Sequence, residues 1–292
     1  MSKKIQKINF FIFAVVALLI IIFGVLLSLR SKSKRSHKKE KPGIVFTCTT
    51  FFDFEKQNKW ECFITAMDSI IKFHDRSVLD QIDTWIVVNE FAENPKKDWE
   101  ALVKEKYPFV TFVTKNSDQK GQAASMNIIL ELIKPYKYWI HWEETWFCRR
   151  ECLGRMIDVV KSTDVDQLQA TQLNDKPSWA DIDPSRLRES KTPNGVDYIY
   201  VLPNPNVEEY KLDKPLDDPQ FMGDWPLYSL LPSINKVAPY DYIGTFNEDV
   251  KYWPFNFELD FAKRWFKQGC KKGILPDGPI IRDNKKHVST YN

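Results

Sequence analysis

The regular alternation of apolar runs with helix-periodic segments between residues 44 and 172 narrows the folds open to this chain. Runs rich in apolar and β-branched residues predict buried strands at residues 44–50, 83–89, 109–114, 138–142 and 167–172. Between them, apolar residues recur at helical spacing over residues 61–74, 99–106, 121–133 and 149–161. Strands that alternate with helices pair in parallel. The sequence therefore predicts an α/β fold with a mainly parallel central sheet and helices on both faces.

The pattern changes in the second half of the chain. Residues 174–220 carry closely spaced prolines, which predict long loops, with a hairpin around residues 198–202. Helical periodicity returns at residues 256–268, followed by a short strand at 273–275. We expect the irregular segment to lie near a substrate, because binding residues are often carried on loops.

The strand predicted at residues 138–142 runs, without a turn residue, into Glu143 and Glu144. In open α/β sheets, ligands bind at the carboxyl ends of the strands. Carboxylates placed there can hold a divalent cation, and the cation can hold a diphosphate. The alternative is a strand end whose two glutamates point to water.

A run of twenty uncharged residues at positions 10–29 predicts a single transmembrane anchor. As a helix it spans about 30 Å, the thickness of a hydrocarbon core. A tail (1–9) precedes it, a basic stem (30–42) follows it, and residues 43–292 remain for one folded domain. Three lysines precede the run and seven basic residues follow it, a count that favours a cytoplasmic domain. A lumenal domain is the alternative, since many anchored carbohydrate enzymes have one.

The net charge of +3 conceals two regions of opposite sign. Ten of the 42 Lys and Arg residues lie in the first 42 positions, with one of the 39 acidic residues. The predicted domain is therefore acidic, which argues against a nucleic-acid partner. The five cysteines are scattered, and the pair Cys148 and Cys152 has no second ligand pair at zinc spacing, so we interpret them as reduced thiols.

Three further segments carry candidate site residues. Gly121, Ser125 and Asn127 lie at a predicted helix start, where small residues and the helix N-terminus suit an anion, and Asn127 can reach a sugar or base. Glu258 opens the last strong helix, either as a general base or as an ordinary helix-start carboxylate. His287 lies in the tail, either solvated or as a metal ligand. Each segment also has an ordinary structural interpretation.

Taken in order, these residues resemble the GT-A glycosyltransferases, close to the family 2 type, over residues 43–292. The resemblance implies that the first strand and its loop contact the nucleotide through Thr47, Thr49 and Thr50, and that Asn89 lies where the family usually has an aspartate against the base or ribose. It also implies that the helix start on the donor side is formed by Gly121, Ser125 and Asn127. The metal would be bound by Glu143 and Glu144, with His287 completing the metal site. Counted back from Arg264 and Gly269, Glu258 falls on the position of the catalytic base. Thr145 and Phe257 depart from the family's acidic residues.

The resemblance implies a membrane-anchored enzyme that transfers a sugar from a nucleotide-sugar donor to an acceptor hydroxyl, with inversion and with a manganese or magnesium ion. The expected acceptor is a glycan or glycoconjugate. A nucleotidyltransferase is one alternative, although residues 49–53 lack its Gly-rich basic loop. A noncatalytic carbohydrate-binding protein is the other, and Thr145 and Phe257 favour it.

Overall fold

The computed structural model describes residues 43–55, 58–173, 176–177, 180, 182–203, 227–249 and 256–282. They all belong to one compact unit, Pro42–Asn292. Within these residues no helix combines the length and the apolar character needed to cross a membrane. The predicted anchor (10–29), the stem (30–42) and His287 lie outside the described residues.

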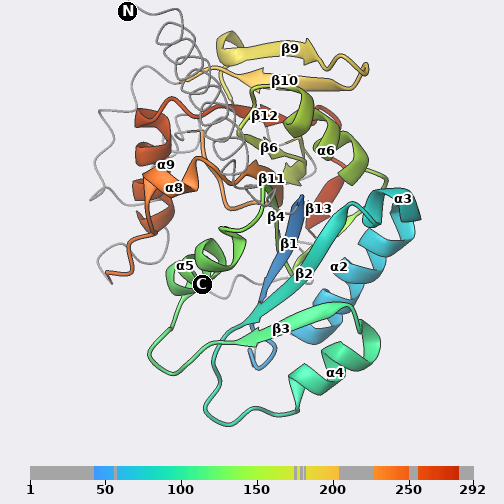
Figure 1. Cartoon of the computed structure of the whole chain (residues 1–292), viewed down its shortest axis with the longest axis vertical. Helices are drawn as coiled ribbons and strands as arrows, with labels where there is room; N and C mark the ends of the chain where they lie inside the picture. The colour runs from blue at the N-terminus through green and yellow to red at the C-terminus, as the bar shows by residue number, and fades with distance from the viewer. Residues whose placement is uncertain are drawn as a thin grey trace, which may run out of the picture. The chain divides into compact units, whose positions relative to one another are not determined.

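A nine-stranded sheet in the order β3-β2-β1-β4-β11-β6-β12-β10-β9 runs through the domain (Figure 1). Its strands are β1 (Ile44–Thr50), β2 (Ile82–Asn89), β3 (Val110–Thr114), β4 (Tyr138–Glu143), β6 (Gln167–Gln169), β9 (Leu187–Lys191), β10 (Asp197–Val201), β11 (Ser233–Lys236) and β12 (Lys272–Ile274). Strands β3, β2, β1 and β4 pair with one another in parallel, and β6 pairs with β12 in parallel. Strands β11 and β10 run against the others. The large central sheet with flanking helices is as predicted, but the sheet is mixed: its first four strands are parallel, and four of its eight pairings are antiparallel.

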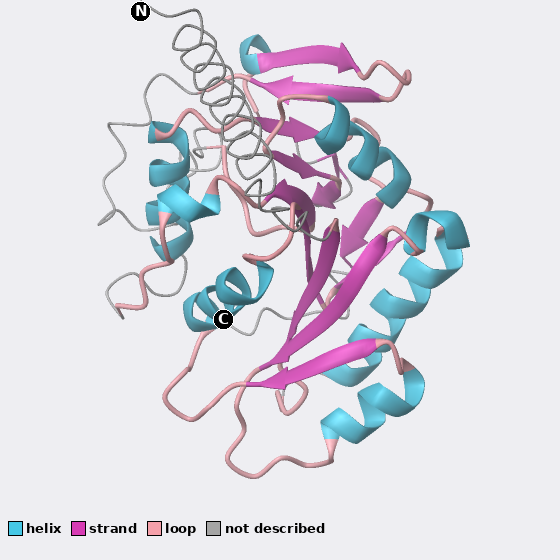
Figure 2. Cartoon of the chain, in the orientation of Figure 1, coloured by secondary structure: helices cyan, strands magenta, loops and turns pink. Residues whose placement is uncertain are grey.

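Helices cover both faces of this sheet, as Figure 2 shows. The helices are α2 (Lys59–Phe73), α3 (Arg76–Leu79), α4 (Trp99–Lys106), α5 (Gln122–Ile133), α6 (Leu153–Ser162), α8 (Tyr240–Ile243) and α9 (Asn256–Lys267), with a 3-10 turn at Pro184–Arg186. Helices α2, α4 and α6 pack with Phe46 and Trp142 in one core cluster. Helices α5, α8 and α9 pack with Val45 and Trp139 in the other. Neighbouring residues of β1 and β4 thus serve opposite cores, because strand side chains alternate between faces.

A second, four-stranded sheet in the order β5-β13-β7-β8 lies beyond the acidic strand end. Its strands are β5 (Trp146–Cys148), β7 (Thr171–Leu173), β8 (Lys176–Pro177) and β13 (Ile280–Arg282). The strand predicted at residues 167–172 is in fact two strands, β6 and β7, which enter different sheets on either side of buried Ala170. The predicted hairpin is confirmed as β9 and β10, which are antiparallel.

Candidate functional site

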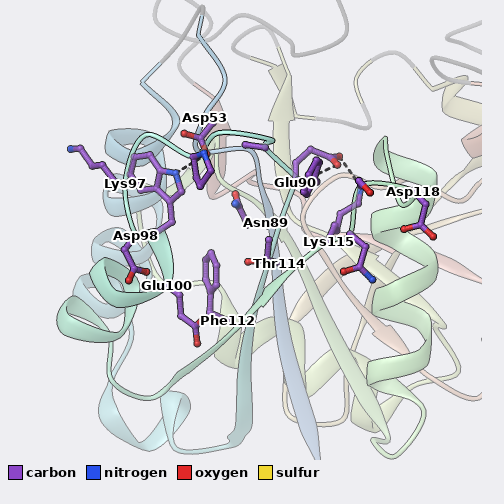
Figure 3. Close-up of a pocket in the computed structure, with 16 residues that line it drawn as sticks. Asp53, Asn89, Glu90, Lys97, Asp98, Glu100, Phe112, Thr114, Lys115 and Asp118 are labelled. Atoms are coloured by element: carbon purple, nitrogen blue, oxygen red, sulfur yellow. Dashed lines mark hydrogen bonds and ion pairs between the residues drawn. The ribbon is translucent and has the colours of Figure 1, made fainter.

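A pocket of about 1100 Å³ opens at the carboxyl ends of β2 and β3 (Figure 3). Asn89 and Glu90 line it from the end of β2, and Thr114 and Lys115 from the end of β3. Trp99, the first residue of α4, lines it from the opposite side. A pocket at this edge is where an open α/β sheet binds ligands.

Asn89 ties the end of β2 to the loop that follows β1. The Thr50 hydroxyl and the Phe52 backbone N–H donate to Asn89 Oδ1 at 3.0 and 3.1 Å. Glu90 N donates to the Thr50 carbonyl at 2.8 Å, which closes the same junction. The structure thus places Asn89, a predicted nucleotide contact, in the lining of the pocket, and Thr50, another, in hydrogen-bond contact with it.

The other two predicted threonines, Thr47 and Thr49, do not line the pocket either. Thr47 is fully buried, and its hydroxyl accepts a hydrogen bond from Trp139 Nε1 at 2.7 Å. It therefore offers no surface to a ligand in this structure. The Thr49 carbonyl accepts from Glu144 N at 3.3 Å, so this residue positions the start of the acidic segment.

Lys115 organises the boundary between the pocket and α5. Its ammonium group is buried and donates to Glu90 Oε2 at 2.7 Å, to the Gly121 carbonyl at 2.8 Å and to Ser125 Oγ at 3.0 Å. Burial lowers the pKa of Lys115, and the Glu90 carboxylate opposes that effect. Gly121 N also donates to Glu90 Oε2 at 3.2 Å. With φ at 86° and ψ at 167°, Gly121 adopts a backbone conformation that is essentially restricted to glycine.

Asn127 connects α5 to the segment after α8. Phe246 N donates to its Oδ1 at 2.7 Å, and its Nδ2 donates to the Phe246 carbonyl at 2.9 Å and to Glu248. The amide predicted to reach a sugar or base is therefore engaged by protein groups, and in this structure it fixes a loop.

Glu143 is the acidic residue that faces α5. Gln122 Nε2 donates to its Oε1 at 2.8 Å, and Trp146 Nε1 donates to its Oε2 at 3.1 Å. Burial raises the pKa of Glu143, and the neighbouring Glu144 charge raises it further. Arg282 of β13 partly offsets these effects.

Glu144 points to the other side of the sheet. Lys59, in the first turn of α2, forms a salt bridge with Glu144 Oε1 at 2.8 Å, and both side chains are almost fully buried. The charge of Glu144 is thus already neutralised by the protein. Of the three predicted metal ligands, Glu143 and Glu144 diverge, and His287 lies outside the described residues.

Glu258 reaches the same region from α9. Leu230 N donates to its Oε1 at 2.8 Å, and the Ser229 hydroxyl also bonds to it. Burial raises the pKa of Glu258 to about 7, and the charge of Glu143 contributes to the rise. Two predicted site residues from opposite ends of the domain are therefore electrostatic neighbours. Gln167 supports this arrangement, because its amide pairs with the Ser229 backbone at 2.9 and 3.0 Å.

Glu143 offers one carboxylate to a divalent cation, and the described residues add no second carboxylate or imidazole ligand beside it. Each carboxylate oxygen of Glu143 accepts one hydrogen bond and keeps a lone pair for a further ligand. Its charge is opposed by Glu144 and Glu258, a repulsion that a cation would relieve. Oxygen ligands of this kind suit magnesium or manganese.

Among the described residues, a second group with metal-ligand chemistry lies elsewhere, at His74, Cys148 and Cys152. His74 Nδ1 donates to the Ile70 carbonyl, so its Nε2 carries the lone pair and accepts from Cys152 N at 3.0 Å and Leu153 N at 3.1 Å. His74 thereby caps the first turn of α6. The arrangement agrees with the prediction of reduced thiols.

Three residues that support the site were missed by sequence reasoning. Lys115 and Glu90 each directly follow a predicted strand. Because the carboxyl ends of neighbouring parallel strands lie at the same edge of the sheet, their ion pair could have been predicted from the sequence. Lys59 carries a weaker signal: a lysine in the first turn of a helix is disfavoured by the helix dipole, which hints at a specific acidic partner.

No known protein family matches this sequence, and no curated protein matches it either. Solved structures do match its fold. GalNAc-T7, crystallised with UDP, GalNAc and Mn²⁺, superposes with a TM-score of 0.51 at 11% identity over 84% of this chain and 44% of its own. TarS of S. aureus (residues 1–349) superposes with a TM-score of 0.52 at 14% identity over 82% of this chain and 60% of its own.

The chain has a GT-A glycosyltransferase fold. A complex of the same TarS fragment with UDP gives a TM-score of 0.51 at 12% identity. The fold that the sequence resemblance implied is therefore confirmed. The chain spans less than two thirds of the length of each of these structures.

Proposed function

We propose that this protein is a glycosyltransferase that moves a sugar from a nucleotide-sugar donor to an acceptor hydroxyl. The observation that carries the proposal is that Glu143, at the end of β4 in a GT-A sheet, and Glu258 lie within electrostatic range of each other. GT-A neighbours that bind UDP, and in one case Mn²⁺, support it.

The donor would lie along the sheet edge, with its base in the pocket beside Asn89 and its diphosphate near Glu143. The loop before α5 would separate the base from the diphosphate. It is held by the hydrogen bonds among Lys115, Glu90 and Gly121. Glu143 would hold a divalent cation, with His287 as the proposed second ligand. When bound, such a cation neutralises the charge that develops on the leaving diphosphate.

Glu258 would act as the general base. Its carboxylate accepts the proton of the acceptor hydroxyl as the hydroxyl oxygen forms a bond to the anomeric carbon and the bond to the diphosphate breaks. A pKa of about 7 suits this task, because a base works best when its pKa is close to the operating pH. One base with a direct attack gives inversion at the anomeric carbon. Leu230 N donates to one oxygen of the base and fixes the orientation of the carboxylate.

We also propose that residues 10–29 anchor the enzyme in a membrane and that the acceptor is a glycan or glycoconjugate. The uncharged run supports the anchor. The charge count around it favours a cytoplasmic domain, with a lumenal domain as the alternative.

The test compares Glu258→Gln with Glu131→Gln, which changes an exposed glutamate on α5. Transfer is measured with a panel of nucleotide sugars and manganese, and donor binding is measured by calorimetry. We expect Glu258→Gln to lose transfer by at least about a hundredfold while donor binding is kept, and Glu131→Gln to behave as wild type. Full turnover by Glu258→Gln would contradict the proposed role of the base.

The Lys59–Glu144 salt bridge favours a second candidate, a noncatalytic carbohydrate-binding protein, because it occupies a predicted metal ligand. Binding of free sugars without binding of any nucleotide in the same calorimetric panel would support this candidate. Metal-dependent binding of one nucleotide series would exclude it.

A further inference from the structure

His74, Cys148 and Cys152 bring an imidazole and two thiols together from three separate elements. His74 directly follows α2, Cys148 is the last residue of β5, and Cys152 is the N-cap residue of α6. Their ligand atoms lie within 4.8 Å of one another, and none of the three residues is more than 5% exposed. Both cysteines are free thiols. The fold thus gathers at one buried point the donor atoms that zinc takes in proteins.

The separations between these donor atoms are those of a tetrahedral metal site. The sulfur atoms of Cys148 and Cys152 are 3.8 Å apart, and Cys152 Sγ is 3.5 Å from His74 Nε2. A zinc ion lies about 2.3 Å from a thiolate sulfur and about 2.0–2.1 Å from an imidazole nitrogen. Tetrahedral angles then place two sulfurs about 3.8 Å apart, and a sulfur and a nitrogen about 3.5 Å apart. Both separations match, so zinc requires little rearrangement of these atoms.

The tautomer of His74 is the one that a metal ligand needs. Its Nδ1 lies 2.6 Å from the Ile70 carbonyl, which can only accept, so Nδ1 carries the proton and Nε2 carries the lone pair. A backbone carbonyl on the other ring nitrogen is the usual support of a histidine ligand. The lone pair now accepts from the N–H groups of Cys152 and Leu153. On metal binding the Cys152 thiolate would replace it as acceptor, because an N-cap side chain accepts from the first turn and a helix N-terminus favours an anion.

Charge balance decides the class of cation. Two thiolates and a neutral imidazole carry two negative charges, so a divalent cation leaves the site neutral, as a buried position requires. Without a cation, burial raises the pKa of Cys152 and keeps its sulfur protonated. Thiolate and imidazole ligands suit zinc, whereas magnesium and manganese prefer oxygen. This chemistry differs from that of the cation proposed at Glu143.

We infer that His74, Cys148 and Cys152 form a zinc site separate from the proposed active site. Binding releases one proton from each thiol to solvent. Among the described residues no fourth His, Cys, Asp or Glu joins the group, so a water molecule would complete the tetrahedron. The ion ties the end of α2 to β5 and to the start of α6. Because β5 begins at Trp146, whose Nε1 donates to Glu143 Oε2, the ion also braces the acidic strand end.

The test follows binding of Co²⁺ and Zn²⁺ to the full chain, purified in detergent with a phosphine reductant. Co²⁺ is the optical probe, because it accepts the same tetrahedral ligands and shows a charge-transfer band only when sulfur binds it. We expect this band in the wild-type protein and its disappearance when Zn²⁺ displaces Co²⁺. Zn²⁺ should also raise the melting temperature.

Cys148→Ser and Cys152→Ser test the ligands. Each should weaken Zn²⁺ binding by at least about a hundredfold, because removal of a ligand costs more than a change in the groups that support it. Cys270→Ser is the matched control, since it makes the same change at a buried free cysteine that packs in the other core cluster. It should keep the cobalt band and the rise in melting temperature.

Reduced wild-type protein that shows no charge-transfer band would overturn the inference, and this result does not depend on how the variants fold. An undiminished band in both Cys148→Ser and Cys152→Ser would overturn it as well. Sugar transfer is not part of either readout, so the proposed function stands or falls separately.

Discussion

Glu258→Gln gives a stability prediction that is independent of activity. Burial raises the pKa of Glu258 from 4.5 to about 7. At about 1.4 kcal/mol for each tenfold change in protonation, the charged form in the folded protein is disfavoured by about 3 kcal/mol. Because the side chain is only partly buried, solvent screening reduces this penalty, and we expect about 1–2 kcal/mol.

The direction in which the stability of the folded protein changes with pH follows from proton linkage. Below about pH 4.5 the glutamate is protonated in both states and costs nothing. Between about pH 4.5 and 7 the unfolded chain releases its proton first, so stability falls. Above about pH 7 the folded protein carries the full penalty. Glutamine has no charge and still accepts from Leu230 N, so the variant avoids this loss.

Urea unfolding at about pH 5 and pH 8 measures the effect. The free energy of unfolding of Glu258→Gln minus that of wild type should be about 1–2 kcal/mol larger at pH 8 than at pH 5. Sugar transfer by the variant should be lost. Glu131→Gln should show no such pH-dependent gain. An equal difference between Glu258→Gln and wild type at both pH values would refute the raised pKa, and with it this account of the base.

Three further predictions concern the surroundings of the site. Gln167→Met removes the amide that pairs with the Ser229 backbone and should lower the free energy of unfolding by about 2–4 kcal/mol in urea. His141→Leu should change it by less than about 1.5 kcal/mol, because neither buried ring nitrogen has a hydrogen-bond partner in the described residues. Lys59→Met breaks a buried salt bridge and should cost about 3–5 kcal/mol; it frees Glu144 for a cation, so manganese should raise its melting temperature more than that of wild type.

The first half of the fold could be predicted because its strands and helices follow local patterns. The structure has a strand at Ile44–Thr50 and a helix at Trp99–Lys106, with the bounds that the sequence predicts. Both faces of this half are covered by helices, so its strands are apolar along most of their length. Such runs are visible without knowledge of their partners.

Strand β11 could not be predicted, because its pairing is not local and three of its four residues are polar. Ser233 and Asn235 are buried, yet they face a hydrogen-bond network instead of apolar side chains. Gln167 Nε2 and the Tyr240 hydroxyl both donate to Asn235 Oδ1. A strand that buries polar groups with their partners lacks the apolar pattern on which sequence reasoning depends.

The adjacent residues Glu143 and Glu144 have different environments, and only one of them is available to a metal ion. Glu143 lies on the α5 face, where it meets Gln122 and the field of Glu258. Glu144, one residue later, lies on the α2 face, where Lys59 neutralises it. In the sequence the two carboxylates are equivalent, but β4 ends at Glu143 and the turn that follows carries Glu144 toward α2. Glu143 has no salt-bridge partner within the described residues, so a search for the metal site should begin there.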